Sequence, residues 1–266
     1  MPVPYGISKM TDFDDRRILS KDPIFATAFS DNHFQEAQDS LQSFSRFLPS
    51  KKVIIFDLGL NISTVHKLMQ LPYVASVRKF DFARYPEYVQ NLFQYRWKPL
   101  FLAEILKEFE AVFYFDAHIK FRENSSFPSL LQKIRCQINA TCKYYNNLML
   151  HHSGHSIFAA TDEGLYDYFP INKSIASKVE MGTGGYQLIY YTKEVRANVY
   201  KWIVLCALEK TCMAPSHRGL ICHFEKNDRW NTFANCHRFD QSVFSILLAH
   251  RNQYDSNRFI VAFALI

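Results

Sequence analysis

Short apolar runs of strand length alternate with stretches of helical spacing in the first half of the chain, and this alternation limits the fold more than any other feature. Four strands are predicted, at 24–29, 53–56, 73–82 and 111–115, and three helices, at 34–48, 63–71 and 99–109. Strands that alternate with helices favour a mostly parallel sheet with helices on both faces. Ligands bind such sheets beyond the carboxyl ends of the strands.

The second half of the chain is less regular. Strands are predicted at 156–160 and 187–191, helices at 195–208 and 240–249, and a loop at 139–147. Residues 1–22 are polar and unpatterned, which predicts a tail. We therefore expect one α/β domain over residues 23–266, with a mostly parallel central sheet and a mixed C-terminal half.

The composition supports a large core and an anionic ligand. Of the 266 residues, 48% are hydrophobic and 16% aromatic, which excludes a disordered chain. The formal charge of +6 favours an anionic ligand such as a nucleotide diphosphate, or a membrane face, although a solvated basic surface is the simpler explanation. There is no long Lys/Arg run and no known nucleic-acid module, so no nucleic-acid partner is expected.

The cysteines and the glycosylation sequons favour an oxidising compartment. The six cysteines form no CxxC pair, which disfavours a zinc site and allows disulfides such as Cys222–Cys236. Four Asn-X-Ser/Thr sequons occur where chance predicts roughly 1.5, at Asn61, Asn124, Asn139 and Asn172. We expect the ER or Golgi lumen, or secretion. The first residues do not resemble a signal peptide, so a membrane anchor would lie outside this chain.

Asp116 is the strongest candidate for site chemistry. It follows the apolar strand 111–115, and His118 lies two positions further on. Alternation places the two side chains on one face, where both can reach one cation. Carboxylate oxygen suits Mg or Mn, and imidazole suits Mn. Such a cation would bind a diphosphate and neutralise charge on a leaving group. The alternative is a strand-end aspartate that caps the next turn.

The segment Tyr114-Phe115-Asp116-Ala117-His118 resembles the Asp-X-Asp motif of GT-A glycosyltransferases, with histidine in place of the second acid. Residues 27–30 resemble the family's first strand, which holds the nucleotide base. The resemblance implies that Thr27, Ala28 and Ser30, together with Asp57, contact the nucleoside. It also implies a divalent cation, Mn or Mg, and a nucleotide-sugar donor.

Three further segments resemble an uncharacterised animal family of glycosyltransferase-like proteins that is abundant in nematodes. They are Tyr-Arg-Trp-Lys-Pro-Leu at 95–100, Cys-Ala-Leu at 206–208 followed by Cys-Met-Ala-Pro at 212–215, and Cys-His-Arg-Phe-Asp-Gln-Ser at 236–242. In GT-A enzymes a late Asp-Gln segment helps to form the acceptor side. The resemblance therefore implies catalytic roles for Asp240 and Gln241.

The same segments supply the other candidate residues. His237 is a candidate metal ligand or proton shuttle, and Arg238 is a candidate partner of phosphate. Asp240 is a candidate proton acceptor, or simply a helix N-cap. The remaining candidates are two glycines, which would allow close approach of a substrate or form a turn, and two basic residues, which would contact a diphosphate or be solvated: Gly184, Gly185, Arg96 and Lys98.

Three functions follow from these residues. The first is a metal-dependent, hexosyltransferase-type enzyme that moves a sugar from a UDP-sugar to a glycan or glycoprotein acceptor. The second is a catalytically silent relative that binds a glycan or a protein, which His118 in place of an acid favours. The third, a methyltransferase, would use the 57–59 turn but does not explain Asp116 and Asp240.

Overall fold

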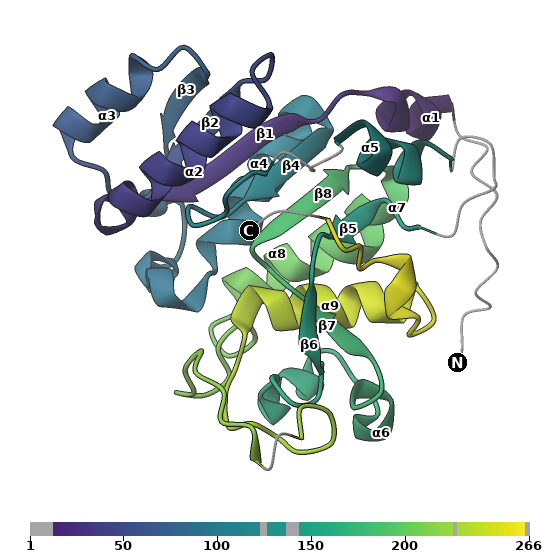
Figure 1. Cartoon of the computed structure of the whole chain (residues 1–266). Helices are drawn as coiled ribbons and strands as arrows, with labels where there is room; N and C mark the ends of the chain where they lie inside the picture. The colour runs from purple at the N-terminus through teal and green to yellow at the C-terminus, as the bar shows by residue number, and fades with distance from the viewer. Residues whose placement is uncertain (1–12, 123–126, 137–143, 226–227, 264–266) are drawn as a thin grey trace.

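A computed structural model describes residues 13–122, 127–136, 144–225 and 228–263. Its centre is a six-stranded sheet in the order β3-β2-β1-β4-β8-β5 (Figure 1). The strands are β1 (Ile24–Phe29), β2 (Val53–Asp57), β3 (Val74–Lys79), β4 (Ala111–Phe115), β5 (Asn147–Met149) and β8 (Tyr186–Tyr190). The neighbours β1, β2, β3 and β4 are parallel, whereas β8 runs antiparallel to β4 and to β5. The predicted mostly parallel α/β sheet is confirmed.

The helices are α1 (Phe13–Ser20), α2 (Phe34–Phe47), α3 (Ile62–Met69), α4 (Trp97–Phe109), α5 (Phe127–Arg135), α6 (Lys173–Ala176), α7 (Lys193–Val195), α8 (Lys201–Leu208) and α9 (Phe239–Arg251). A π-helical segment, Arg196–Tyr200, joins α7 to α8. Single 3₁₀ turns occur at Asp31–His33, Phe82–Arg84, Glu87–Gln90, Leu92–Gln94, Glu163–Asp167 and Ser256–Arg258. A separate two-stranded sheet, β6 (His152–Ser156) with β7 (Glu180–Gly182), lies with α6 at the opposite end of the molecule from α3 and β3 (Figure 1).

The sheet is buried on both faces because successive strand residues alternate between two cores. Phe25 and Phe29 of β1 belong to a cluster with residues of α1, α2 and α5. Ala26 and Ala28 of the same strand belong to a second cluster with residues of α4, α8 and α9. A continuous apolar run is what a doubly covered parallel strand requires. The parallel pairing brings the carboxyl ends of β1, β2, β3 and β4 to one edge, where the candidate site lies.

Two predictions of local structure are wrong. Residues 13–20 are not a tail: they form α1, where Leu19 is fully buried and Arg17 donates two hydrogen bonds of 2.7 Å to Glu110. The predicted strand at 156–160 is a turn after Ser156, because β6 ends there. Of the predicted loop 139–147, residues 139–143 lie outside the described residues and Asn147 begins β5.

Within the described residues, two disulfides join parts of the C-terminal half. Cys222–Cys236 is confirmed, and Cys206 pairs with Cys212. Cys206 and Cys212 close the end of α8, whereas Cys222 and Cys236 tie together the long segment that precedes α9. Among the described helices, none combines the length and the apolar character that crossing a bilayer requires.

Candidate functional site

Lys98 lies at the centre of the candidate site, in the first turn of α4. Tyr95, just before the helix, has φ of 54°, and this left-handed residue turns the chain from a 3₁₀ turn into α4. Pro99 suits the first helical turn, where its missing N–H has no acceptor to lose. The side chain of Lys98 is only 2% exposed and points to the carboxyl ends of the strands, so its charge must be balanced inside the protein.

Two carboxylates and one carbonyl surround the Lys98 ammonium. Nζ lies 3.1 Å from Asp116 Oδ1, 3.3 Å from Asp240 Oδ2 and 3.3 Å from the carbonyl oxygen of Gly184. Nζ donates hydrogen bonds to Asp116 Oδ2 at 3.4 Å and to the Gly184 carbonyl, whereas Asp240 Oδ2 is an ion-pair partner with no hydrogen bond among the described residues. Lys98 was predicted to contact a diphosphate; in the structure it lies between two acids. We define Lys98, Asp116 and Asp240 as the site cluster.

The charges of the site cluster depend on one another. Burial lowers the pKa of Lys98, but the neighbouring carboxylates of Asp116 and Asp240 outweigh it, and the net pKa is raised. Burial raises the pKa of Asp240, and the nearby Lys98 ammonium opposes this shift only in part. Lys98 therefore stays cationic, whereas Asp240 takes up a proton more readily than an ordinary aspartate. Such a carboxyl group can accept a proton in a reaction near neutral pH.

Asp116 is positioned by the register of β4 and β8. Its N–H donates a 2.7 Å hydrogen bond to the carbonyl of Gly185, because β8 pairs Tyr186 with Phe115. The hydroxyl of Tyr114 donates a hydrogen bond to Asp116 Oδ1. Burial, followed by the charge of Asp116, raises the pKa of Tyr114 well above its ordinary value, so the phenol stays a donor. The spacing of Tyr114 and Asp116, two residues apart on one strand face, was the available signal for this contact.

The site cluster approaches the backbone closely at Gly184. A Cβ there would lie 3.3 Å from Asp240 Oδ2 and 3.2 Å from the Cβ of Gln241, which is tighter than most Cβ contacts. At Gly185 a Cβ would make ordinary contacts, 3.5 Å to Asp116 Oδ2 and 3.8 Å to His118 Nε2. Of the two glycines predicted to allow close approach, Gly184 therefore does so for one of the protein's own carboxylates.

A cavity of about 330 Å³ opens over the site cluster, and we name it the site cavity. Its lining combines the cluster with neighbouring polar, aromatic and apolar side chains: Tyr95, Lys98, Asp116, His118, Ile119, His151, Thr183, Gly184, Gly185, Tyr186, Leu220, Arg238, Asp240 and Gln241. The buried hydroxyls of Thr183 and Tyr186 have no hydrogen-bond partner among the described residues. Buried polar atoms are normally paired, so these two hydroxyls suit a polar ligand.

Eight of the predicted site residues therefore line one cavity, together with residues that the sequence did not indicate. The missed residues include Tyr95, His151, Thr183 and Tyr186. They are aromatic or small polar residues in loops and strand ends, and nothing in their local pattern separates them from others in the chain. The pairing of β8 with β4 brings Thr183 and Tyr186 to the carboxyl edge, whereas Tyr95 is placed by the start of α4 and His151 by the end of β5.

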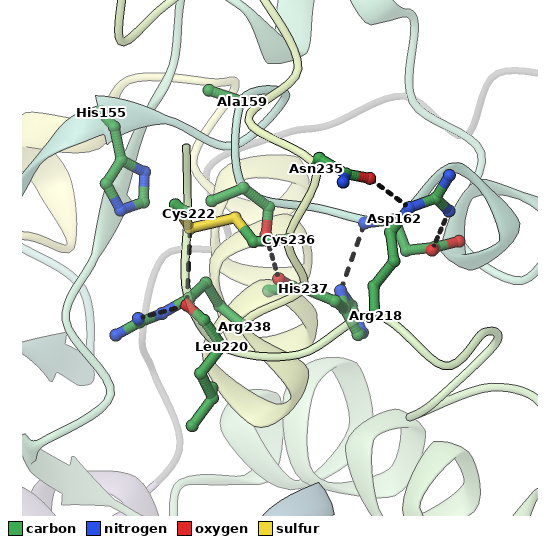
Figure 2. The surroundings of a disulfide bond; sticks show 12 residues. His155, Ala159, Asp162, Arg218, Leu220, Cys222, Asn235, Cys236, His237 and Arg238 are labelled. Atoms are coloured by element: carbon green, nitrogen blue, oxygen red, sulfur yellow. Dashed lines mark hydrogen bonds and ion pairs between the residues drawn. A yellow bond between two sulfur atoms is a disulfide. The ribbon is translucent and has the colours of Figure 1, made fainter. Parts of the chain in front are cut away.

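A loop fastened by Cys222–Cys236 forms one wall of the site cavity. Figure 2 shows this disulfide beside Leu220 and Arg238, both of which line the cavity. Arg238 donates through Nη1 to the carbonyl of Leu220 at 3.2 Å and through Nε to Gln241 Oε1 at 3.3 Å. Its other terminal nitrogen, Nη2, makes no hydrogen bond within the described part of the chain. Arg238 thus keeps a donor for an anionic ligand.

The prediction of His237 as a metal ligand is corrected, because both its ring nitrogens are already engaged. Nδ1 accepts a 3.2 Å hydrogen bond from the N–H of Asp162, and Nε2 donates to the carbonyl of Met213 at 3.1 Å (Figure 2 shows the first of these). The residue is 1% exposed and does not line the site cavity. Burial lowers the pKa of His237 to about 4, so the ring is neutral at pH 7.

Asp162 and Arg218 complete a second buried ionic group, which we define with His237 as the loop cluster. Arg218 Nη1 lies 2.5 Å from Asp162 Oδ2, and the hydroxyl of Ser216 donates to the same oxygen at 2.5 Å. Burial raises the pKa of Asp162, but the Ser216 and Arg218 contacts outweigh it and lower the net value. The loop cluster anchors the segment that carries Leu220 and Arg238.

Arg96 is also corrected, because it is a structural residue and not a ligand contact. It is 1% exposed, and its guanidinium donates to the carbonyls of Ala207 at 3.0 Å, Glu209 at 2.9 Å and Lys210 at 2.6 Å. These carbonyls lie at the end of α8 and just after it. Carbonyl groups at a helix end have no N–H partner within the helix, so Arg96 supplies donors for them. Arg96 therefore joins the end of α8 to the start of α4.

The residues predicted to hold a nucleoside lie elsewhere along the carboxyl edge. Asp57 accepts hydrogen bonds from the N–H groups of Gly59 at 2.7 Å and Leu60 at 2.6 Å, and lines a separate cavity of about 410 Å³. That cavity shares no lining residue with the site cavity. Thr27, Ala28 and Ser30 are buried at the end of β1, between the two cavities in the strand order, and line neither. The Thr27 hydroxyl is buried without a partner among the described residues.

Asp116 and His118 are the residues that would hold a divalent cation. His118 is exposed, and its Nε2 and the Asp116 carboxylate both lie within 4 Å of the position of a Cβ on Gly185. No group of three or more His, Cys, Asp or Glu side chains suited to a metal occurs within the described ranges. Magnesium is commonly bound through one or two carboxylates plus substrate phosphates, and Asp116, which also pairs with Lys98, supplies one carboxylate here.

Comparison with known proteins identifies the fold. Residues 6–103 match the model of a family described as a protein of unknown function, DUF1647. No curated protein matches the chain by sequence. Among solved structures, the bifunctional glycosyltransferase WbbM is 13% identical, with a TM-score of 0.52 over 92% of this chain and 39% of that chain, so this chain spans well under half of WbbM.

Two further glycosyltransferase structures align over most of the chain with lower TM-scores. The galactosyltransferase LgtC, solved with donor and acceptor sugar analogues, is 13% identical over 89% of this chain and 72% of that chain, at a TM-score of 0.44. Mouse xyloside xylosyltransferase 1 is 10% identical over 91% and 85%, at 0.46. The similarity to WbbM, and the parallel sheet with an antiparallel β8 beside β4, show that the chain has the GT-A-like fold of nucleotide-sugar transferases.

Proposed function

We propose that this protein is a glycosyltransferase that moves a sugar from a nucleotide-diphosphate sugar to a hydroxyl-bearing acceptor in the site cavity. The observation that carries the proposal is the site cluster: Asp116 and Asp240 lie on either side of the Lys98 ammonium, at 3.1 and 3.3 Å. The cluster lies at the carboxyl edge of a parallel sheet, where α/β folds bind ligands. The GT-A-like fold supports this function over the methyltransferase.

Each polar residue of the site cavity has a role in this proposal. Arg238 binds the diphosphate through its unengaged Nη2, and Gln241 holds that guanidinium in place. Asp240 accepts the proton of the acceptor hydroxyl, and its raised pKa suits that step. Lys98 is a positioning residue, since its ammonium pairs with Asp116 and Asp240 and donates to the Gly184 carbonyl.

Asp116 and His118 would hold a divalent cation, Mn or Mg, which would neutralise the charge of the departing nucleotide diphosphate. We further propose a UDP-sugar donor, transfer of a hexose, and a glycan or glycoprotein acceptor, as the sequence resemblance implies. The two disulfides support action in the Golgi or ER lumen, or outside the cell.

The proposal is tested by replacing the Asp116 carboxylate without changing its size. Asp116→Asn is expected to lower turnover of the preferred nucleotide sugar by about 100-fold or more, because the charge that faces the diphosphate site is lost. Hydrolysis and transfer are measured with a panel of UDP- and GDP-sugars in Mn. Asp39→Asn, which removes an exposed acid paired with Lys120, is the matched control and should retain wild-type turnover. Equal turnover by wild type and Asp116→Asn would contradict the proposal.

A catalytically silent binding module is the second candidate, and two observations favour it. His118 stands where the second acid of the motif is expected, and Asp116 is already paired with Lys98. Thermal unfolding with and without UDP-sugars and Mn separates the two functions, because a ligand of the folded state raises the melting temperature by mass action. A donor-induced rise that needs both Mn and the Asp116 carboxylate supports the enzyme. A metal-independent rise with an acceptor glycan alone supports the silent module.

A further inference from the structure

A second cavity, of about 300 Å³, lies at the other end of α9, and we name it the aromatic cavity. Asp240 and Gln241 at the start of α9 line the site cavity, whereas Leu247, His250 and Arg251 near its end line the aromatic cavity. The ten helical steps from Asp240 to His250 span roughly 15 Å along the helix axis. The two cavities share no lining residue, so the aromatic cavity requires its own explanation.

Two exposed aromatic rings line the aromatic cavity, Trp202 at 45% and Tyr168 at 42% exposure. Exposed rings of this size cost free energy in water, and they are enriched where a ligand covers them. Tyr168 is held in place by a 2.6 Å hydrogen bond between its hydroxyl and Thr211 Oγ1. Lys201 Nζ lies 5.0 Å from the Trp202 ring centroid and so covers one side of that ring. A fixed ring loses little conformational entropy when a ligand binds.

His250 gives the aromatic cavity an unused polar atom. Its Nε2 is buried without a partner among the described residues. Burial lowers the pKa of this imidazole, so the ring is neutral at pH 7. A ring nitrogen of neutral histidine either accepts or donates one hydrogen bond, and a ligand hydroxyl satisfies both cases.

The helical segment that carries Trp202 also contributes Asn198 to the lining of the aromatic cavity. Asn198 lies in the π-helical segment and is exposed, and Trp202 follows it by four residues, on the same side of the helix. π-Helical segments are rare and occur frequently at functional sites. The charge of Arg251 is not available, because Glu194 pairs with it. The lining therefore combines aromatic faces with neutral donors and acceptors and has no unpaired charge.

We infer that the aromatic cavity binds a neutral sugar ring, with Trp202 and Tyr168 against its apolar C–H faces and His250 and Asn198 on its hydroxyls. A pyranose presents both surfaces at once, which a purely apolar ligand or an anion does not. This inference stands apart from the proposed transfer reaction, because it requires binding and not turnover. It would give the protein a second contact with a carbohydrate outside the site cavity.

The test is saturation-transfer NMR with the full chain and named neutral probes: lactose, maltose and N,N′-diacetylchitobiose, at up to about 10 mM. We expect transfer to ring protons of at least one probe, and about tenfold weaker binding by Trp202→Ala, with a similar loss for His250→Phe, which keeps the ring volume but removes the polar atom. Trp230→Ala, which removes a tryptophan that is 37% exposed and does not line the aromatic cavity, is the matched control and should bind as wild type.

Other outcomes would overturn the inference. No transfer to any neutral probe, or equal transfer by wild type and Trp202→Ala, would exclude a sugar on these rings. Binding of 3′-sialyllactose without binding of lactose would show that the ligand is anionic. Asp240→Asn locates the binding independently: a signal that this variant abolishes would belong to the site cavity, whereas a signal that it leaves unchanged supports the aromatic cavity even if no transfer activity is found.

Discussion

The site cluster and the loop cluster both bury aspartate beside a cation, yet they have different consequences. In the loop cluster, Arg218 and Ser216 contact Asp162, and the group lies away from the site cavity. In the site cluster, one ammonium is shared by two carboxylates, so one negative charge remains in excess beside an open cavity. A buried ion pair alone therefore does not mark a site; the surplus charge and the adjoining space do.

The largest expected effect comes from removing the shared cation. Lys98→Met leaves Asp116 and Asp240 buried without a counter-charge, which is expected to cost about 3–5 kcal/mol of unfolding free energy. Urea denaturation followed by circular dichroism measures it. Lys98→Met combined with Asp116→Asn and Asp240→Asn removes all three charges and should recover most of the loss. If Lys98→Met lowers the unfolding free energy by less than about 1 kcal/mol, the site cluster is a solvated surface group. The contrast drawn between the site cluster and the loop cluster is then wrong.

Acid titration separates the loop cluster from the site cluster. The pKa of His237 is lowered from 6.5 in the unfolded state to about 4 in the folded state. Between these two pH values the imidazole is therefore protonated in the unfolded chain and neutral in the folded chain. Stability is therefore unaffected above pH 6.5 and falls between pH 6.5 and 4, by about 3 kcal/mol.

Melting temperatures measured from pH 7.5 to 4.5 should show this fall. His237→Gln is the control: it keeps hydrogen-bonding groups but cannot titrate, so its stability should change less over the same range. Parallel curves for the two proteins would show that the loop cluster does not hold a neutral imidazole.

The smallest expected effect concerns the contact between Gly184 and the site cluster. A Cβ at Gly184 would lie 3.3 Å from Asp240 Oδ2, so Gly184→Ala should displace that carboxylate by a few tenths of an ångström. We expect a stability loss of about 1 kcal/mol and a larger relative loss of transfer activity. Gly219→Ala, where a Cβ would contact nothing within 4 Å, is the matched control. A fall in stability with unchanged turnover would show that transfer activity does not depend on the exact position of the Asp240 carboxylate.

Much of the fold was predictable because, in the first half of the chain, the local sequence pattern agrees with the element that forms there. The apolar run at β1 and the helical spacing of α2 each reproduce the element to within one residue. The tail was mispredicted because α1 buries only a few side chains, Ile18 and Leu19 among them, and eight residues carry little periodic signal. The strand at 156–160 failed because an apolar run can equally be a buried turn.

The acids of the site were predictable, whereas the different roles of Arg96 and Lys98 were not. Asp116 and Asp240 follow from strand-end position and family resemblance, and both line the site cavity. Arg96 and Lys98 are indistinguishable by local pattern, since both are basic residues beside the start of one helix. Arg96 contacts the end of α8, whereas Lys98 contacts Asp116, Gly184 and Asp240, so only tertiary structure assigns them different roles.

Arg96 has a consequence for how the protein can vary. It donates hydrogen bonds to the end of α8 through the main-chain oxygens of Ala207, Glu209 and Lys210, in a turn that the Cys206–Cys212 disulfide also closes. A change of the exposed side chains at 209 and 210 therefore leaves these hydrogen-bond acceptors in place. Deleting a single residue from the turn would instead withdraw an acceptor and tilt the first turn of α4, so this part of the surface tolerates substitution but not a change of length.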